Sequence, residues 1–147
     1  MNIEKLRFEF ITDWLKALIE DYGFSIEILS DYLLLTREQI LWLSDGELDF
    51  LSDENLDKGR VFDKVAALYL SATEDKDLKL AGFLGVLINC HHLSQQTIAK
   101  MAGVVEMDVE NLLQDQAELV PENAKYRIAV TVMSLRFCFK EREPKRH

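Results

Sequence analysis

The chain has few residues of the kinds that cross-link or interrupt a fold: two cysteines, two prolines and six glycines among 147 residues. Cys90 and Cys138 lie inside apolar helical patterns, and two cysteines do not form a disulfide framework. We expect buried free thiols. The run Cys90-His91-His92 does not predict a metal site, because neighbouring side chains on a helix point about 100° apart. No second pair of ligands follows at the spacing of a zinc finger.

Basic residues are also scarce, since 17 Lys and Arg stand against 26 Asp and Glu, and the formal net charge is −9. This charge argues against a protein that coats nucleic acid, because such affinity comes from Lys and Arg on phosphates. It leaves room for a local basic face. The sequence also lacks a nucleophile–base pair, a Gly-rich phosphate loop and a cluster of metal ligands, so it predicts neither an enzyme nor a cofactor.

Long apolar runs are missing too, and none approaches the roughly 20 residues that span a bilayer. The first residues, MNIEKLRFEF, have neither a basic region nor an uninterrupted apolar stretch of the kind found in signal peptides. We therefore expect a cytoplasmic protein with no membrane partner. Apolar residues make up 48% of the chain, which is enough for a packed core in one domain or in two very small ones.

What the sequence does contain is an internal similarity. When the chain is shifted by 69 positions, residues 14–43 align with residues 83–112 without a gap. Few residues are identical, but the apolar positions coincide, as at Leu29 and Ile98. We interpret this as two copies of one helical unit. The predicted domains are residues 1–72 and residues 77–140, followed by a flexible tail at 141–147.

The apolar spacing within each copy is helical, with no strand-like alternation. Ser25 and Thr36 are suited to cap helices, and Thr36 with Gln39 has the spacing of a capping box. In the first unit we expect helices at 3–22, after Ser25, after Thr36, briefly after Gly46, and at 58–72. In the second unit we expect helices near 77–91, 94–102, 105–115 and 123–140.

In the middle of each copy, two short helices are separated by a tight turn. Such a pair needs a small residue where the helices cross, a left-handed residue at the turn and a branched apolar residue in the second helix. The second copy supplies Ala99, Gly103 and Val109 at these positions, and the first supplies Ser30, Leu34 and Ile40. Because a left-handed Leu costs about 1–2 kcal/mol, we expect the first turn to be longer or differently bent.

The segment LSQQTIAKMAGV (93–104) resembles the helix-turn-helix of the lambda-repressor/Cro family, which often reads close to L-S-Q-x-x-L-A-x-x-x-G-V. A second segment resembles the same pattern more weakly: residues 23–46, GFSIEILSDYLLLTREQILWLSDG. The resemblance implies an all-α fold of two repeated helix-turn-helix bundles of about five helices each. It also implies that the exposed start of the second motif helix reads bases.

By position, the resemblance assigns base reading to Thr36, Arg37, Glu38 and Gln39 in the first copy and to residues 105–108 in the second. Arg and Gln are good base readers, whereas the acidic Glu106, Asp108 and Glu110 would be repelled by phosphates. Residues 8–70 are strongly acidic, while residues 79–140 are balanced. The DNA-binding candidates are Thr36, Arg37, Gln39, Gln95, Gln96, Lys100, Lys58 and Arg60.

Two hypotheses follow. The first is a DNA-binding transcription regulator in which tandem motifs in one chain replace a dimer. The second is a protein-interaction or self-association module that keeps the fold without binding DNA, and it uses exposed aromatic residues such as Trp42 as the interface. The plainer alternative for Trp42 is that it packs in the core. Partners are then DNA, or a protein or second copy of the chain. The resemblance favours the regulator, whereas the electrostatics favours the module. The interface candidates for the module are Leu41, Trp42, Phe50, Phe137 and Phe139.

Overall fold

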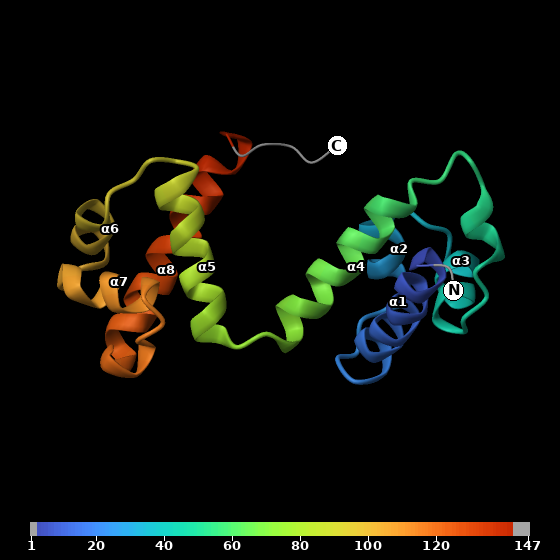
Figure 1. Cartoon of the computed structure of the whole chain (residues 1–147), viewed down its shortest axis with the longest axis horizontal. Coiled ribbons are helices and arrows are strands. Elements are labelled where there is room, and N and C mark those ends of the chain that lie inside the picture. Colours follow the sequence, from blue (N-terminus) through green and yellow to red (C-terminus); the bar gives the residue numbers. More distant parts are fainter. Residues whose placement is uncertain (1–2, 143–147) are drawn as a thin grey trace. The chain divides into compact units, whose positions relative to one another are not determined.

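The computed structural model describes residues 3–142, with side chains for residues 8–141 (Figure 1). These residues form eight α-helices and three short 3₁₀ helices, without strands. The chain divides into two compact units, with the boundary between Thr73 and Glu74. None of the described helices is both long and apolar enough to cross a membrane.

The two units share one order of elements, apart from a 3₁₀ helix at the end of the second. The first contains α1 (Ile3–Glu20), α2 (Ile26–Leu33), α3 (Arg37–Ser44), η1 (Asp49–Ser52) and α4 (Lys58–Thr73). The second contains α5 (Lys76–Asn89), α6 (Gln95–Ala102), α7 (Glu106–Leu113), η2 (Ala117–Leu119), α8 (Glu122–Phe139) and η3 (Lys140–Arg142).

The predicted all-α class is confirmed, and each described unit has four α-helices and a 3₁₀ turn between the third and fourth. The helix after Gly46 is this 3₁₀ turn rather than an α-helix. The predicted tail at 141–147 lies outside the described residues from position 143 onwards.

The core of the first unit follows from helical spacing of apolar residues. In α1, Ile11, Leu15 and Leu18 are fully buried at intervals of three and four, and α4 buries Val61 and Val65. Each fully buried Leu or Ile contributes about 1.5–3 kcal/mol. The first helix contacts the third and fourth, and the second contacts the same two. The buried core is Phe8, Ile11, Leu15, Leu29, Leu33, Leu35, Ile40, Leu43, Leu51, Val61 and Val65.

The second unit repeats this plan, because α5 contacts α7 and α8, and α6 contacts the same two helices. Most of its buried residues occupy the aligned positions of the first unit. Leu84 and Leu87 in α5, for example, correspond to buried leucines of α1. The buried core is Leu84, Leu87, Ile98, Ala99, Ala102, Val109, Leu112, Val120, Ala124, Ile128, Val132 and Leu135.

The turns recur as closely as the core does. Every residue with positive φ in the described part of the first unit has a counterpart with positive φ 69 positions later. In each pair one member is Gly and the other is not. Gly adopts positive φ without a steric cost, and neither unit has Gly at all three turns. The pairs are Gly23 with His92, Leu34 with Gly103, and Gly46 with Asp115.

The expectation of a different first turn is wrong. Leu34 ends α2 with φ 55° and ψ 45°, and Gly103 ends α6 with φ 72° and ψ 36°. The next amide closes both turns in the same way: Leu35 N–H donates to Ser30 O at 3.2 Å, and Val104 N–H donates to Ala99 O at 3.1 Å. The Leu34 side chain is 70% exposed, so the cost of the turn is the local one between its Cβ and the following carbonyl oxygen.

The expectation of buried cysteines is also wrong, since both thiols are free but exposed. Cys90 lies at the end of α5, where the helix gives way to a turn, and Cys138 lies on the outer side of α8. Buried residues lie one turn before each cysteine, Leu87 before Cys90 and Leu135 before Cys138. Their helical pattern therefore did not reveal which side of the helix each cysteine occupies.

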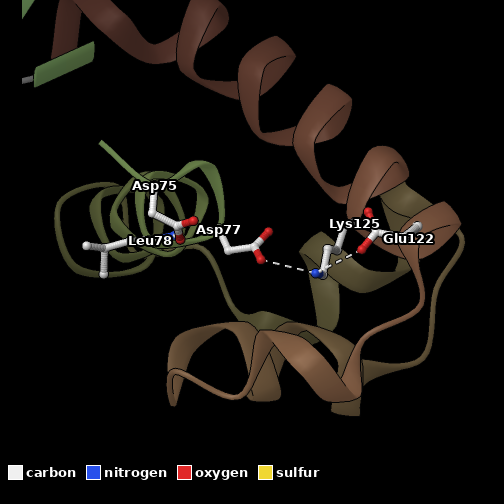
Figure 2. A network of polar contacts seen from close by, with 5 residues as sticks. All are labelled: Asp75, Asp77, Leu78, Glu122 and Lys125. Carbon is white, nitrogen blue, oxygen red and sulfur yellow. Dashed lines mark hydrogen bonds and ion pairs between the residues drawn. The ribbon is translucent and has the colours of Figure 1, made fainter. Parts of the chain in front are cut away.

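A polar network joins the start of α5 to the start of α8 (Figure 2). Lys125 Nζ lies 3.2 Å from Asp77 Oδ2 and 3.2 Å from Glu122 Oε1. Hydrogen bonds to Asp77 and then Glu122 raise the pKa of Lys125. Beside this network, Asp75 Oδ2 accepts the Leu78 N–H at 3.0 Å and caps α5. Lys125 thus holds two helix starts together.

Exchanging the residue type at the first turn tests the strain at Leu34. Leu34→Gly should raise the free energy of unfolding of the first unit by about 1 kcal/mol, because Gly adopts φ > 0 without the steric cost. The aligned variant Gly103→Ala should destabilise the second unit by at least as much, because the added Cβ would also lie 3.1 Å from Arg127 Nη1. Both tryptophans, Trp14 and Trp42, lie in the first unit, so urea unfolding followed by tryptophan fluorescence reports on Leu34→Gly. Circular dichroism, which sees the helices of both units, reports on Gly103→Ala. Destabilisation by Leu34→Gly would contradict this account.

The Lys125 network predicts a loss of stability at alkaline pH. Because the folded pKa of Lys125 is raised, its contribution is fully present below the ordinary lysine pKa of about 10.4 and is lost as the pH rises through the folded value. Lys125→Met should therefore be less stable than the wild type at neutral pH, and the difference should shrink above about pH 10.4. Urea unfolding followed by circular dichroism measures both. Lys100→Met, at an exposed position, is the control, and an equal loss there would contradict the prediction.

Candidate nucleic-acid interface

The orientation of the two motif helices is the same in both units. Leu29 and Ile40 are fully buried in the first unit, as are Ile98 and Val109 in the second. This inward placement agrees with the sequence expectation. Because the period of a helix is 3.6 residues, Arg37 at the start of α3 and Glu106 at the start of α7 are turned outward, and both are exposed.

At the start of α3, two predicted base readers bond to each other. Thr36 N–H donates to Gln39 Oε1 at 2.9 Å, and Gln39 N–H donates to Thr36 Oγ1 at 3.1 Å. This is the capping box that the sequence predicts. It satisfies amides of the first helical turn, but it directs the carbonyl end of Gln39 back toward the helix. Base recognition by Gln39 would have to break the cap.

The third predicted reader, Arg37, has a partner within its own unit. Its guanidinium forms an ion pair with Glu27 of α2, and both side chains are mostly exposed. The pKa of Glu27 is lowered, first by a hydrogen bond to its own backbone and then by the charge of Arg37. A phosphate would therefore have to compete with a carboxylate for this cation.

Behind these residues, Trp42 packs against Phe50, with ring centroids 5.9 Å apart. Trp42 remains 43% exposed, and Leu41 beside it is half exposed. With Glu47 and Asp49 the two rings line an open cavity of about 510 Å³. Trp42 is thus neither a core residue nor fully free, and its surroundings are acidic.

The basic residues of α4 do not form an outward cluster. Lys58 is half buried at the helix start, and Nη1 of Arg60 is buried without a hydrogen-bond partner in the described residues. Lys64 Nζ donates to Tyr32 O at 2.8 Å, while Tyr32 Oη donates to Lys64 O at 2.8 Å. Burial raises the pKa of Tyr32. Lys64 and Tyr32 therefore tie α4 to α2.

In the second unit, the start of α7 is more open. Its N-cap is Val105, at the position aligned with Thr36, and no side chain caps the helix. Val105, Glu106 and Met107 are exposed, and Met101 of α6 is exposed as well. The outward surface is therefore apolar with carboxylates along one side.

The first helix of this motif carries the remaining candidates. Ser94 Oγ accepts the Thr97 N–H at 3.0 Å and caps α6, as Ser25 caps α2 by accepting the Ile28 N–H. Gln95 is half buried, whereas Gln96 and Lys100 are exposed one turn apart. The described structure gives Lys100 no ion pair, so its charge is available.

Arg127 of α8 is a basic residue that the sequence did not single out as a candidate. A Cβ at Gly103 would lie 3.1 Å from Arg127 Nη1, so the guanidinium rests over the turn between α6 and α7. Arg127 and Asp108 line a shallow cavity of about 300 Å³ there. Lys125, in contrast, is already matched by Asp77 and Glu122. Only tertiary structure distinguishes these two cations.

The remaining aromatic candidates separate in the same way. Phe137 is the most exposed large apolar residue of the described chain. Phe139 is half buried, and its ring centroid lies 5.6 Å from that of buried His91. Phe139 is therefore part of the edge of the core. No group of three or more His, Cys, Asp or Glu within the described residues is arranged to hold a metal.

The family comparison agrees with this geometry. A family model described as a helix-turn-helix domain matches residues 7–145 and so covers both units. Neither the curated proteins nor the solved structures provide a match to the chain. Since the matched segment is nearly the whole sequence, the chain belongs to this family of helix-turn-helix domains.

Proposed function

We propose that the protein is a DNA-binding transcription regulator of the lambda-repressor type, and that its second unit makes the principal contact with the duplex. The observation that carries this proposal is a pair of cations beside the exposed start of α7. Lys100 lies on α6 and Arg127 lies over the α6–α7 turn, and neither has an ion pair within the described residues. Phosphate contacts of this kind position a reading helix.

The exposed residues of α7 suit a limited direct readout. Val105 and Met107 present apolar groups that fit the methyl group of thymine, and Glu106 is an acceptor for the amino group of cytosine. Gln96 and the first amides of α6 are donors for a phosphate. A carboxylate is tolerated in such a surface only when cations beside it hold the phosphates.

The first unit is less suited to DNA. Thr36 and Gln39 are joined in the capping box, Arg37 is paired with Glu27, and residues 8–70 are strongly acidic. Its field repels phosphates at the distance of a few ångströms where contacts form. The recurrent turns and buried positions support an origin of both units by internal duplication, with DNA contact kept in the second copy.

The second candidate function is an interaction module that keeps the fold without binding DNA. It is favoured by one observation, the half-exposed Trp42 and Phe50 in an acidic setting where a DNA reader would present polar or basic groups. Under this alternative, α3 contacts protein and neither unit contacts a duplex.

A salt titration with matched variants separates the two functions. Fluorescence anisotropy with a labelled random duplex of about 25 base pairs should show binding at low salt, with a linear fall of log affinity against log salt concentration. Lys100→Ala and Arg127→Ala should each weaken binding at all sequences and reduce the salt slope by about 1. Arg37→Ala is the control and should have little effect, because Glu27 already neutralises it.

One result would contradict the regulator, and another would contradict the assignment of DNA contact to the second unit. If the duplex shows no binding at low salt, the interaction module becomes the better account. If Arg37→Ala weakens binding as much as Lys100→Ala does, the first unit takes part and the assignment of contact to the second unit is wrong.

A further inference from the structure

The outward face of α8 is apolar along its whole length. Tyr126, Val130, Met133 and Phe137 are 69%, 48%, 67% and 87% exposed. Their spacing of four, three and four residues keeps them on one narrow stripe of the helix. We call this stripe the α8 seam. A contiguous exposed row of large apolar side chains marks an interaction site rather than ordinary surface.

The opposite side of the same helix is the part that packs in the unit. Ala124, Ile128, Val132 and Leu135 are buried in the core of the second unit. α8 is therefore apolar on two opposite faces, and only one of them is covered. Polar residues such as Arg127 and Ser134 lie between the two faces, so the exposed stripe is separate from the core-facing one.

The first unit provides an internal comparison. When Val61 and Val65 of α4 are aligned with Ile128 and Val132 of α8, the seam positions fall on Gly59, Asp63, Ala66 and Leu70. The buried positions remain apolar, but the outward positions of α4 carry no comparable stripe. The fold therefore does not require an apolar outer face on its last helix, and the α8 seam needs a separate cause.

The alternation of four and three residues is the pattern that packs one helix against another of the same kind. An open cavity of about 330 Å³ borders the seam, lined by Phe83 of α5 together with Met133, Arg136, Phe137 and Lys140. The guanidinium of Arg136 lies 5.0 Å from the centroid of the Phe83 ring and forms one wall. The cavity offers a place for an aromatic side chain from a facing helix.

Charge indicates which helix fits. Glu122 lies at the N-terminal end of the seam, where it contacts Lys125 of its own unit while its side chain stays 91% exposed. Lys140 lies at the C-terminal end of the seam on the same side of the helix. If two copies pair in antiparallel fashion, Glu122 of each faces Lys140 of the other, and Tyr126 of each reaches the cavity beside Phe137. Such a contact is self-complementary, as a two-fold symmetric interface must be.

We propose that two copies of the chain associate through an antiparallel pairing of their α8 seams. The association does not depend on DNA. Lys100 and the α6–α7 turn, which we propose to contact DNA, are not part of the α8 seam. It assigns the self-association of this chain to α8 rather than to the aromatic pair at Trp42.

Sedimentation velocity over a concentration series tests the pairing without any ligand. The wild type should form dimers, and Phe137→Glu should raise the dimer dissociation constant about tenfold or more, because a charge then enters the apolar contact. Leu70→Glu, at the aligned exposed position of α4, adds the same charge and should leave the dimer intact. Phe137→Leu should retain it as well, and melting curves by circular dichroism verify that all variants fold.

A charge exchange tests the direction of pairing. Glu122→Lys and Lys140→Glu should each weaken the dimer, because like charges then face each other, and the double variant should restore it. A wild type that stays monomeric at about 100 µM, a level at which even weak contacts of this kind populate dimers, would overturn the proposal. So would a dimer that Phe137→Glu leaves unchanged, or a double variant no better than the single ones.

Discussion

The burial of one apolar residue in each motif helix is the constraint on which the rest of the structure depends. Leu29 and Ile40 in the first unit, and Ile98 and Val109 in the second, are completely withdrawn from solvent. Because side chains recur every 3.6 residues on a helix, fixing these positions also fixes which residues of α3 and α7 face outward. The packing of the core therefore determines which side chains of α3 and α7 a binding partner can reach.

The two units use this shared frame with different outer residues. At the start of α3, the cap and the ion pair with Glu27 occupy the polar side chains that the frame turns outward. At the start of α7, the same positions hold Val105 and Glu106, and no side-chain cap forms. A helix start that is closed on itself is stable but has few free donors. An uncapped start is less stable alone and more available to a ligand.

Much of the fold could be predicted from the sequence because its signals are local and periodic. The helical spacing gave the elements, and the capping box at Thr36 formed as the spacing indicated. Leu34 was misjudged because the cost of a left-handed Leu, about 1–2 kcal/mol, is smaller than the burial that α2 and α3 gain from the tight turn. At this turn, tertiary packing outweighs the local conformational preference of Leu34.

The candidate site was harder to predict, because its electrostatics depend on distances that sequence spacing does not contain. Arg37 and Glu27 are ten positions apart in the chain, and Arg127 lies over a turn formed around Gly103. Both arrangements require the folded unit. The charge of a residue type is visible in the sequence, whereas its partner is not.

Comparison of α4 with α8 separates what the fold needs from what this chain has added. The buried valines of α4 and their counterparts in α8 stay apolar because each closes a core of similar size. The outward positions are free to change, and there Gly59 and Asp63 contrast with Tyr126 and Val130. Large apolar residues on a solvent face reduce solubility and add nothing to the core that they do not touch. Their presence on one unit alone is best explained by a contact outside that unit.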